Sequence, residues 1–233
     1  MKVVGISDLH GYLPENIIPE CVILCIAGDV LPLDIQTNSS KSRKWLHHEF
    51  LPWCKRQPAE HVVLVAGNHD FYFENHDYDV HKMCDDAGFN IHYLNNENIT
   101  IEGVNIFGSP DCHIFYDWAF MYDNAVEKEH FLKMWSGCDI MVTHDAPYGT
   151  SDICMADTPW NTHEHIGNPA LKDAILEREP RYCLHGHLHT TNHECEMLGK
   201  TAVYNVSYID EAYKPAFEPL VLDIDLVDHH VKI

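Results

Sequence analysis

Short apolar runs that end in polar, metal-ligand-type residues are the feature that most constrains this sequence. The five clearest runs are Lys2–Ser7, Val22–Ala27, His61–Ala66, Ile140–Thr143 and Tyr182–Leu184. Short apolar runs bounded by turn residues predict buried strands. Asp, Asn or His follows each run within a few positions. Because open α/β sheets place their sites at the carboxyl ends of their strands, we expect these polar residues to converge.

Helices are expected between these strands. The candidate helices are Ser39–Gln57 with a kink at Pro52, Tyr78–Ala87, Asn124–Ser136 with Asn124 as its cap and Glu127 in a capping box, and Asn168–Glu179 with Pro169 at its first position. A hairpin is predicted over Ile99–Phe107, and antiparallel strands over Glu194–Leu198, Thr201–Val206 and Leu220–Val227. This alternation indicates an α/β fold of stacked mixed sheets covered by helices. No composition break divides the chain, so we expect one domain over residues 1–233.

The charge balance excludes several classes of partner. The chain of 233 residues has 15 Lys and Arg against 36 Asp and Glu, a formal charge of −21. So acidic a surface repels nucleic acid and anionic membranes. No apolar stretch approaches the ~20 residues that span a bilayer, and no signal peptide is visible. The nine cysteines are scattered without a C-x-x-C motif, which favours reduced thiols and a cytoplasmic location.

Histidine is unusually abundant, with 19 residues, and several lie at the predicted strand ends. Carboxylate, amide and imidazole donors suit divalent Mn, Fe, Zn, Co or Ni. No thiolate belongs to the set, so a structural zinc site is not expected. One metal needs only three or four ligands, and the surplus predicts two metals that share a bridging carboxylate. The strand-end set is Asp8, His10, Asp29, Asn68, His69, Asp70, His144, His187 and His189.

The order of these residues resembles the signature of the calcineurin-like metallophosphoesterase superfamily. The blocks here are Asp8-Leu9-His10, Gly28-Asp29, Gly67-Asn68-His69-Asp70, His144 and Gly186-His187-Leu188-His189. Looser similarity to the metallophosphoesterase-domain-containing (MPPED-type, class III phosphodiesterase) branch extends across the chain. It lies in Thr143-His144-Asp145-Ala146-Pro147, Phe107-Gly108-Ser109-Pro110 with Trp118-Ala119-Phe120, and Tyr204-Asn205-Val206-Ser207.

The resemblance implies a four-layer α/β/β/α sandwich with mixed sheets inside and helices outside. It also implies that Asp8, His10 and His189 hold the first metal. Asn68, His144 and His187 would hold the second, and Asp29 would bridge the two. His69 would face the leaving-group oxygen, and Asp70 would accept a hydrogen bond from its other ring nitrogen.

The chemistry explains why a site of this kind suits an acidic chain. Two divalent cations against the carboxylates of Asp8 and Asp29 leave a local surplus of about +2, which attracts an anionic phosphoester. Such a metal pair clamps phosphate oxygens and turns a bridging water into hydroxide near neutral pH. A protonated His69 acting as general acid would contribute ~10²–10⁴-fold.

We therefore expect a metal-dependent phosphodiesterase that acts on a small phosphoester, with cyclic nucleotides among the candidates and manganese as the most active metal in vitro. The alternatives are a broad phosphomonoesterase, a nucleotide pyrophosphatase, or a scaffold that has lost the chemistry. No Arg follows Gly28-Asp29 closely, which argues against a protein phosphatase. The oligomeric state stays open.

Four further residues have alternative interpretations. His113 follows the Gly108-Ser109-Pro110 block and is a candidate for substrate binding, against a plain surface-loop residue. Trp118 and Phe120 are expected in the core more than on a platform that stacks a base. His185 precedes the Gly186 block, matches no ligand position, and is expected to be a packed or pocket-lining histidine.

Overall fold

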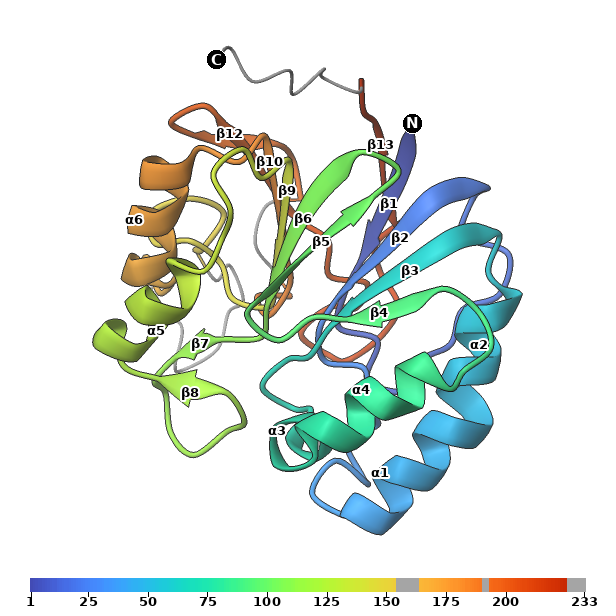
Figure 1. Cartoon of the computed structure of the whole chain (residues 1–233). Coiled ribbons are helices and arrows are strands. Elements are labelled where there is room, and N and C mark those ends of the chain that lie inside the picture. The colour runs from blue at the N-terminus through green and yellow to red at the C-terminus, as the bar shows by residue number, and fades with distance from the viewer. Residues whose placement is uncertain (154–163, 190–192, 226–233) are drawn as a thin grey trace.

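The computed structural model describes residues 1–153, 164–189 and 193–225, and its architecture is a pair of sheets with helices on both outer sides (Figure 1). The first sheet has the order β13-β1-β2-β3-β4. Its strands are β1 (Lys2–Ile6), β2 (Cys21–Ala27), β3 (Ala59–Val65), β4 (Ile91–Tyr93) and β13 (Leu220–Asp223). Strands β1 to β4 run parallel, whereas β13 pairs antiparallel with β1, Val4 lying opposite Val221.

The second sheet has the order β11-β12-β10-β9-β6-β5. Its strands are β5 (Glu97–Ile101), β6 (Val104–Ser109), β9 (Ile140–Thr143), β10 (Tyr182–His185), β11 (Glu196–Leu198) and β12 (Thr201–Asn205). The four central strands are parallel, and the predicted hairpins β5–β6 and β11–β12 form the two edges. A short separate sheet pairs β7 (Cys112–His113) with β8 (Met121–Tyr122).

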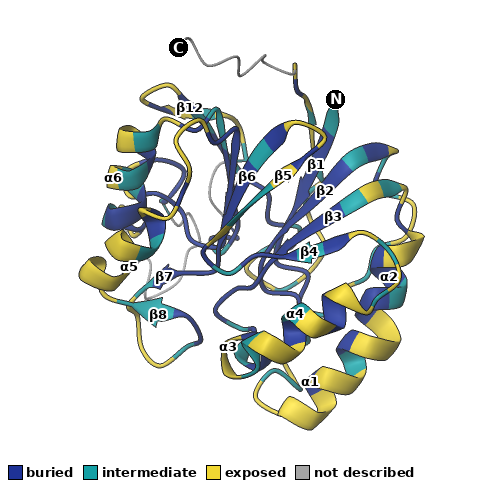
Figure 2. Ribbon diagram, in the orientation of Figure 1, coloured by how far each residue is buried: buried dark blue, intermediate teal, exposed yellow. Residues whose placement is uncertain are grey.

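Three apolar clusters show how the layers pack. The cluster between the sheets joins Val3, Ile23 and Val63 of the first sheet to Ile140 and Leu184 of the second. A second cluster packs the helices of the first half of the chain on the outer face of the first sheet. A third cluster packs α5 (Asn124–Phe131) and α6 (Pro169–Arg178) on the outer face of the second. These contacts give the expected four layers, and buried ribbon runs through both sheets while the outer helix faces are exposed (Figure 2).

The predicted helix over 39–57 forms, but it is not uniform. It consists of α1 (Ser39–Trp45), a π-helical turn η1 (Leu46–Phe50) and α2 (Leu51–Arg56). Pro52 lies in the first turn of α2. Proline has no N–H to donate and its ring crowds the carbonyl four residues earlier, so the preceding turn widens. The remaining helices in this half are α3 (Phe71–Asn75) and α4 (Asp77–Asp85).

Helix α5 starts one residue earlier than expected. Asp123, not Asn124, is the N-cap, and its side chain accepts from the backbone N–H groups of Ala125 and Val126. Glu127 therefore forms no capping box and turns inward instead. The cap of α6 is Asn168, as predicted. None of the described helices has the length and apolar character needed to cross a membrane.

The parallel strands of both sheets place their carboxyl ends at one common edge. The bridge between Ser7, after β1, and Ser207, after β12, joins the two sheets at this edge. Loops that follow β1, β2, β3, β9 and β10 therefore meet there.

Candidate metal centre

The loops that carry the strand-end residues adopt an unusual backbone conformation. Asp8, His10, Asp29 and His187 all have positive φ angles, of 55°, 42°, 52° and 68°. Residues other than glycine adopt this left-handed region at a cost, and such residues cluster at functional sites. The strain turns these side chains sharply out of the strands and toward one another.

Asp8, His10 and His189 form one group. Their ligand-type atoms all lie within 4.8 Å of one another, and all three residues are buried. Nε2 of His189 is 3.3 Å from Oδ1 of Asp8. The other oxygen of Asp8 accepts a hydrogen bond of 2.7 Å from the Ser207 hydroxyl, which fixes the carboxylate. Neither ring nitrogen of His10 has a hydrogen-bond partner among the described residues, although both are buried.

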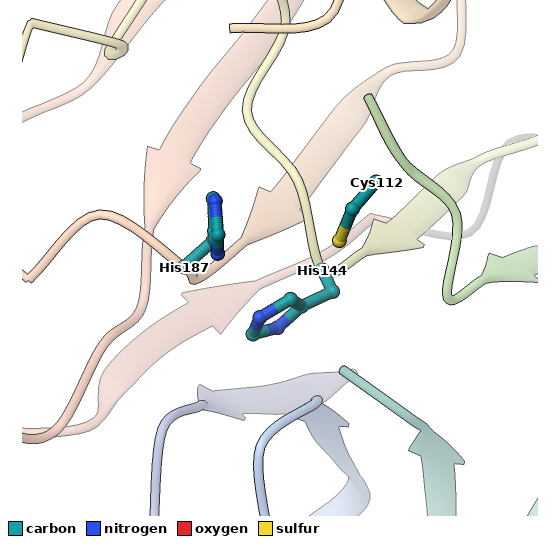
Figure 3. A group of neighbouring side chains, drawn as sticks. All are labelled: Cys112, His144 and His187. Atoms are coloured by element: carbon teal, nitrogen blue, oxygen red, sulfur yellow. The ribbon is translucent and has the colours of Figure 1, made fainter. Parts of the chain in front are cut away.

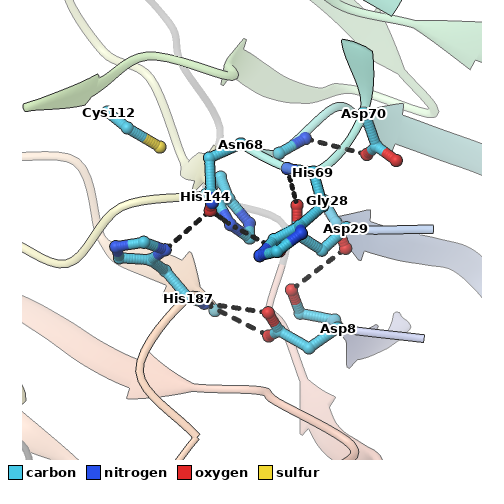
Figure 4. A network of polar contacts seen from close by, with 12 residues as sticks. Asp8, Gly28, Asp29, Asn68, His69, Asp70, Cys112, His144 and His187 are labelled. Atoms are coloured by element: carbon cyan, nitrogen blue, oxygen red, sulfur yellow. Dashed lines mark hydrogen bonds and ion pairs between the residues drawn. The ribbon is translucent and has the colours of Figure 1, made fainter. Parts of the chain in front are cut away.

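Asn68, His144 and His187 form a second group (Figure 4). Oδ1 of Asn68 lies 2.9 Å from Nε2 of His144 and 2.8 Å from Nδ1 of His187. Nδ1 of His144 donates to the carbonyl of Ala27 at 2.9 Å, so Nε2 is the nitrogen turned into the site.

Asp29 lies between the two groups. Its Oδ2 is 3.5 Å from Nε2 of His10 in the first group and 3.4 Å from Nε2 of His144 in the second. Its Oδ1 accepts the backbone N–H of His69 at 2.8 Å. One oxygen of this carboxylate thus lies near a histidine of each set.

Cys112 also approaches this centre, which the sequence did not suggest. Its sulfur belongs to a group of possible ligand atoms with His144 and His187 (Figure 3). Burial raises the pKa of this thiol well above its usual range, with the nearby acidic groups adding to the effect. A protonated thiol is a weak ligand, so Cys112 lines the site without belonging to the donor set.

The electrostatics separate the histidines into two kinds. Burial lowers the pKa of His10 to about 4 and that of His187 to about 3, so both rings are neutral. Burial opposes the charge on His144 too, but Asp29 outweighs it and raises the pKa to about 10. Burial also raises the pKa of Asp29, yet His144 and His69 hold it well below the ordinary value.

His69 lies beside these groups, but the prediction that Asp70 is its hydrogen-bond partner is wrong. Its Nε2 is 4.0 Å from Oδ2 of Asp29, and its Nδ1 lies 2.6 Å from Oε1 of Gln36, not against Asp70. The Asp70 carboxylate instead accepts backbone N–H groups of Gly67, Val30 and Leu31 at 2.9 to 3.2 Å. An Asp side chain is short, and the loop after β2 folds over it and saturates its oxygens.

Asp70 therefore ties the loop after β2 to the loop after β3. Burial raises its pKa to about 7 and Asp29 adds to this rise, against the three amide donors, which lower it. The role that remains for Asp70 is to fix the loops that carry Asp29 and Asn68.

A cavity of about 510 Å³ opens from the centre. Four strand-end residues form its floor, namely Asp29, Asn68, His187 and His189, and His69 and His113 lie on its wall. Its apolar side is formed by Ile114, Phe115, Trp118, Met121, Ile166 and Leu188. Phe120 is buried as expected, but the expectation of a core position for Trp118 is wrong, because Trp118 lines this cavity. The Trp118 ring lies 4.5 Å from that of His69.

His185 is confirmed as a packed histidine. It is fully buried, and burial lowers its pKa to about 4.

Three residues that support the site had no role predicted from the sequence. Gln36 follows no recognisable motif. Tyr213 places its ring 5.0 Å from that of His10 and 5.3 Å from that of His189. Ser207 is the last residue of the block Tyr204-Asn205-Val206-Ser207, and its hydrogen bond to Asp8 gives this block a structural role at the candidate metal centre.

Comparison with known proteins identifies the class that this fold and site define. The family model of calcineurin-like phosphoesterases matches residues 1–191, and the chain belongs to this family. The family is one of metal-dependent phosphoesterases, and the groups of candidate ligand atoms agree with this class.

Individual relatives place the chain near the expected branch. It is 26% identical to human metallophosphoesterase domain-containing protein 1, over 96% of this chain and 71% of the relative. It is 27% identical to UPF0046 protein K07C11.7 of Caenorhabditis elegans, over 96% and 75%. The fold is similar to the crystal structure of TT1561 of Thermus thermophilus, with a TM-score of 0.58, 13% identity and coverage of 95% and 98%. It is also similar to phosphopantetheinyl hydrolase of Mycobacterium tuberculosis, with a TM-score of 0.57, 16% identity and coverage of 91% and 90%.

Proposed function

We propose that this protein is a phosphodiesterase that uses two divalent metal ions. The observation that carries the proposal is the convergence of seven ligand-type side chains from two sheets at one edge. The first metal would be held by Asp8, His10 and His189, and the second by Asn68, His144 and His187. Asp29 would bridge them, and its contacts with both sets support this role.

The residues present fit a pair of cations. The buried ring of His10 has two nitrogens without hydrogen-bond partners in the described chain, and a neutral imidazole is the form that binds metal. Two buried carboxylates, one amide oxygen and four imidazoles suit borderline and hard ions, with manganese as the proposed activator in vitro. Bound at these donors, the metals would supply the Lewis acidity that activates water and neutralises phosphate charge.

His69 would hold the leaving-group proton. Gln36 lies against Nδ1, so Nε2 is the nitrogen turned toward Asp29 and the cavity. A proton delivered from Nε2 to the departing oxygen lets it leave as an alcohol, because an alkoxide leaves poorly. Asp70 contributes by positioning, since it ties together the loops that carry Asp29 and His69.

The cavity favours a diester over a monoester. No Lys or Arg is among the described residues that line it, and the acidic Glu211 lies on its wall. A monoester carries a second negative charge, and no Lys or Arg of the described lining would balance it. The second substituent of a diester finds an apolar side formed in part by Phe115, Trp118 and Met121. Cyclic nucleotides, which pair one phosphate charge with a flat base, are candidate substrates.

Parallel assays test this proposal. The manganese-loaded protein is given bis(p-nitrophenyl) phosphate and p-nitrophenyl phosphate, followed by 2′,3′- and 3′,5′-cyclic nucleotides. We expect a higher kcat/KM on the diester, and loss of metal and activity in Asp29→Asn. Equal or better hydrolysis of the monoester would contradict the preference for diesters. Full activity without metal would contradict the proposal of a metal-dependent phosphodiesterase.

The cysteines support a cytoplasmic location. All eight described cysteines are free, and seven of them are buried. A reducing compartment keeps thiols in this state.

A further inference from the structure

A buried acid lies behind the wall of the cavity and is not used by the proposed metal centre. Glu127, in the first turn of α5, has a side chain with 0% exposure. The N-cap of that helix is Asp123, so Glu127 has no capping role. Its two oxygens instead have two partners: Asn168 Nδ2 donates to Oε1 at 2.8 Å, and His113 Nδ1 lies 3.1 Å from Oε2.

His113 connects this buried acid to the cavity. Its ring is 33% exposed and lies on the same wall as His69. Its backbone N–H donates to the buried carboxylate of Asp145 at 2.9 Å, which fixes the strand β7 at this point. Since Nδ1 is turned to Glu127, the opposite nitrogen Nε2 is on the edge of the ring that faces the open side.

The pair offers a hydrogen-bond donor to the cavity wherever its shared proton lies. If the proton is on the histidine, the imidazolium carries N–H groups on both nitrogens. If it is on Glu127, the carboxyl O–H donates to Nδ1, and the neutral ring must carry its own proton on Nε2. Only loss of the shared proton leaves Nδ1–H donating to the carboxylate and turns Nε2 into an acceptor.

We propose that His113, positioned by Glu127 and Asn168, is a substrate-contacting residue that donates from Nε2 to a phosphoester oxygen. The cavity needs such a donor because its described lining holds no Lys or Arg. The pair carries no net charge in either tautomer, so it contacts the oxygen of a singly charged diester without attracting a dianion. This inference rests on the proposed function, since the ligand it names is the substrate of that site.

Kinetics of four variants test the proposal on bis(p-nitrophenyl) phosphate with manganese. His113→Ala removes the donor, and we expect KM to rise ~10- to 100-fold, the size of a hydrogen bond to a charged group. The contact exists before and during reaction, so kcat changes little. His130→Ala is the matched control, because His130 pairs with the buried Asp111 at 2.7 Å but does not line the cavity. Its KM should stay at the wild-type value.

The pH dependence separates positioning from mere packing. In Glu127→Gln the amide oxygen still accepts from Asn168, and the amide N–H donates to Nδ1, which locks the proton of His113 on Nε2. We expect the wild-type KM to rise at alkaline pH and the Glu127→Gln KM to stay flat. Glu127→Ala should raise KM at every pH. Asp145 and the Cys112 thiol, two titratable groups that interact with Glu127, are unchanged in all these variants.

Two outcomes overturn the inference without touching the proposed function: an unchanged KM in His113→Ala, or a wild-type pH profile in Glu127→Gln. If the wild type hydrolyses no phosphoester, the proposed function fails. In that case ¹⁵N NMR of the histidine side chains in the metal-free protein shows which nitrogen of His113 carries the proton. The inference then requires His113 to carry its proton on Nε2 at neutral pH, and to keep it at alkaline pH only in Glu127→Gln. A proton on Nδ1 at neutral pH would refute it.

Discussion

Gly186 separates the two sheets at the proposed metal centre, and replacing it with alanine gives the sharpest test of the geometry. A Cβ at this position would lie 2.0 Å from Oγ of Ser7 and 2.4 Å from Oδ2 of Asp8. Ordinary van der Waals contact starts near 3.4 Å. Asp8 would therefore have to move by about 1 Å, or the loop that carries His187 would have to move away by a similar distance.

A shift of Asp8 would disturb the proposed first metal site, and a shift of the loop that carries His187 would disturb the second. Metal–ligand distances tolerate deviations of only about 0.2 Å. His187 is also coupled to Asp8, because its backbone N–H lies 3.2 Å from both Asp8 oxygens. We expect Gly186→Ala to bind fewer than two metal ions per chain and to lose at least ~100-fold in kcat/KM. Overpacking itself costs ~1–3 kcal/mol, so the protein should still fold.

Metal content after dialysis, measured by inductively coupled plasma mass spectrometry, is the direct assay, with circular dichroism to check folding. Gly103→Ala is the matched control: Gly103 has a positive φ of 84°, but a Cβ there meets nothing within 4 Å. That variant should lose a little stability and keep its metals. A Gly186→Ala protein with two tightly bound metals and wild-type activity would refute this reading of the loops.

Four other outcomes are expected. His69→Ala should keep its metal content and lose ~10²–10⁴-fold in kcat, most strongly with poor leaving groups. Gln36→Ala should lose less in kcat, and an unchanged kcat in both variants would contradict His69 as general acid. Chelation should lower Tm, because manganese at 100 times its Kd adds ~2.7 kcal/mol, roughly 5–10 °C for a chain of this size; calorimetry with and without EDTA checks this. Burial raises the pKa of Glu127 from 4.5 to about 7, so its contribution to stability is present below pH 4.5 and is lost as the pH rises through 7. Denaturant unfolding should therefore show Glu127→Gln to be more stable than wild type at pH 8 but not at pH 4. Trp118→Ala should weaken inhibition by phenylphosphonate ~10-fold and leave methylphosphonate unaffected, whereas equal losses would argue against an aromatic contact.

The strands and the convergence of their ends could be predicted because both depend on local pattern. An apolar run that stops at Asp or His is visible in the sequence, and parallel strands bring such ends to one edge. The order of the strands within each sheet was harder to predict. Strand β13 was predicted, but its place beside β1 depends on contacts between residues more than 200 positions apart, such as Met1 with Ile224.

Partners of individual side chains were the least predictable part. Gln36 contacts His69 in the place expected for Asp70, because the path of the loop after β2 decides which group reaches His69. The start of α5 was similarly ambiguous: Asp123 and Asn124 are both good caps, and a shift of one residue turned Glu127 from a cap into a buried partner of the cavity wall.

The division of the ligand set between two sheets has a consequence for how the protein unfolds. Loops of the first sheet carry Asp8, Asp29 and Asn68, whereas His144 and His187 come from the second. A cation bound by residues of both sheets would cross-link the sheets, because neither sheet alone offers enough donors to bind it. Separation of the sheets must then break those bonds, so bound metal should slow unfolding far more than it speeds folding.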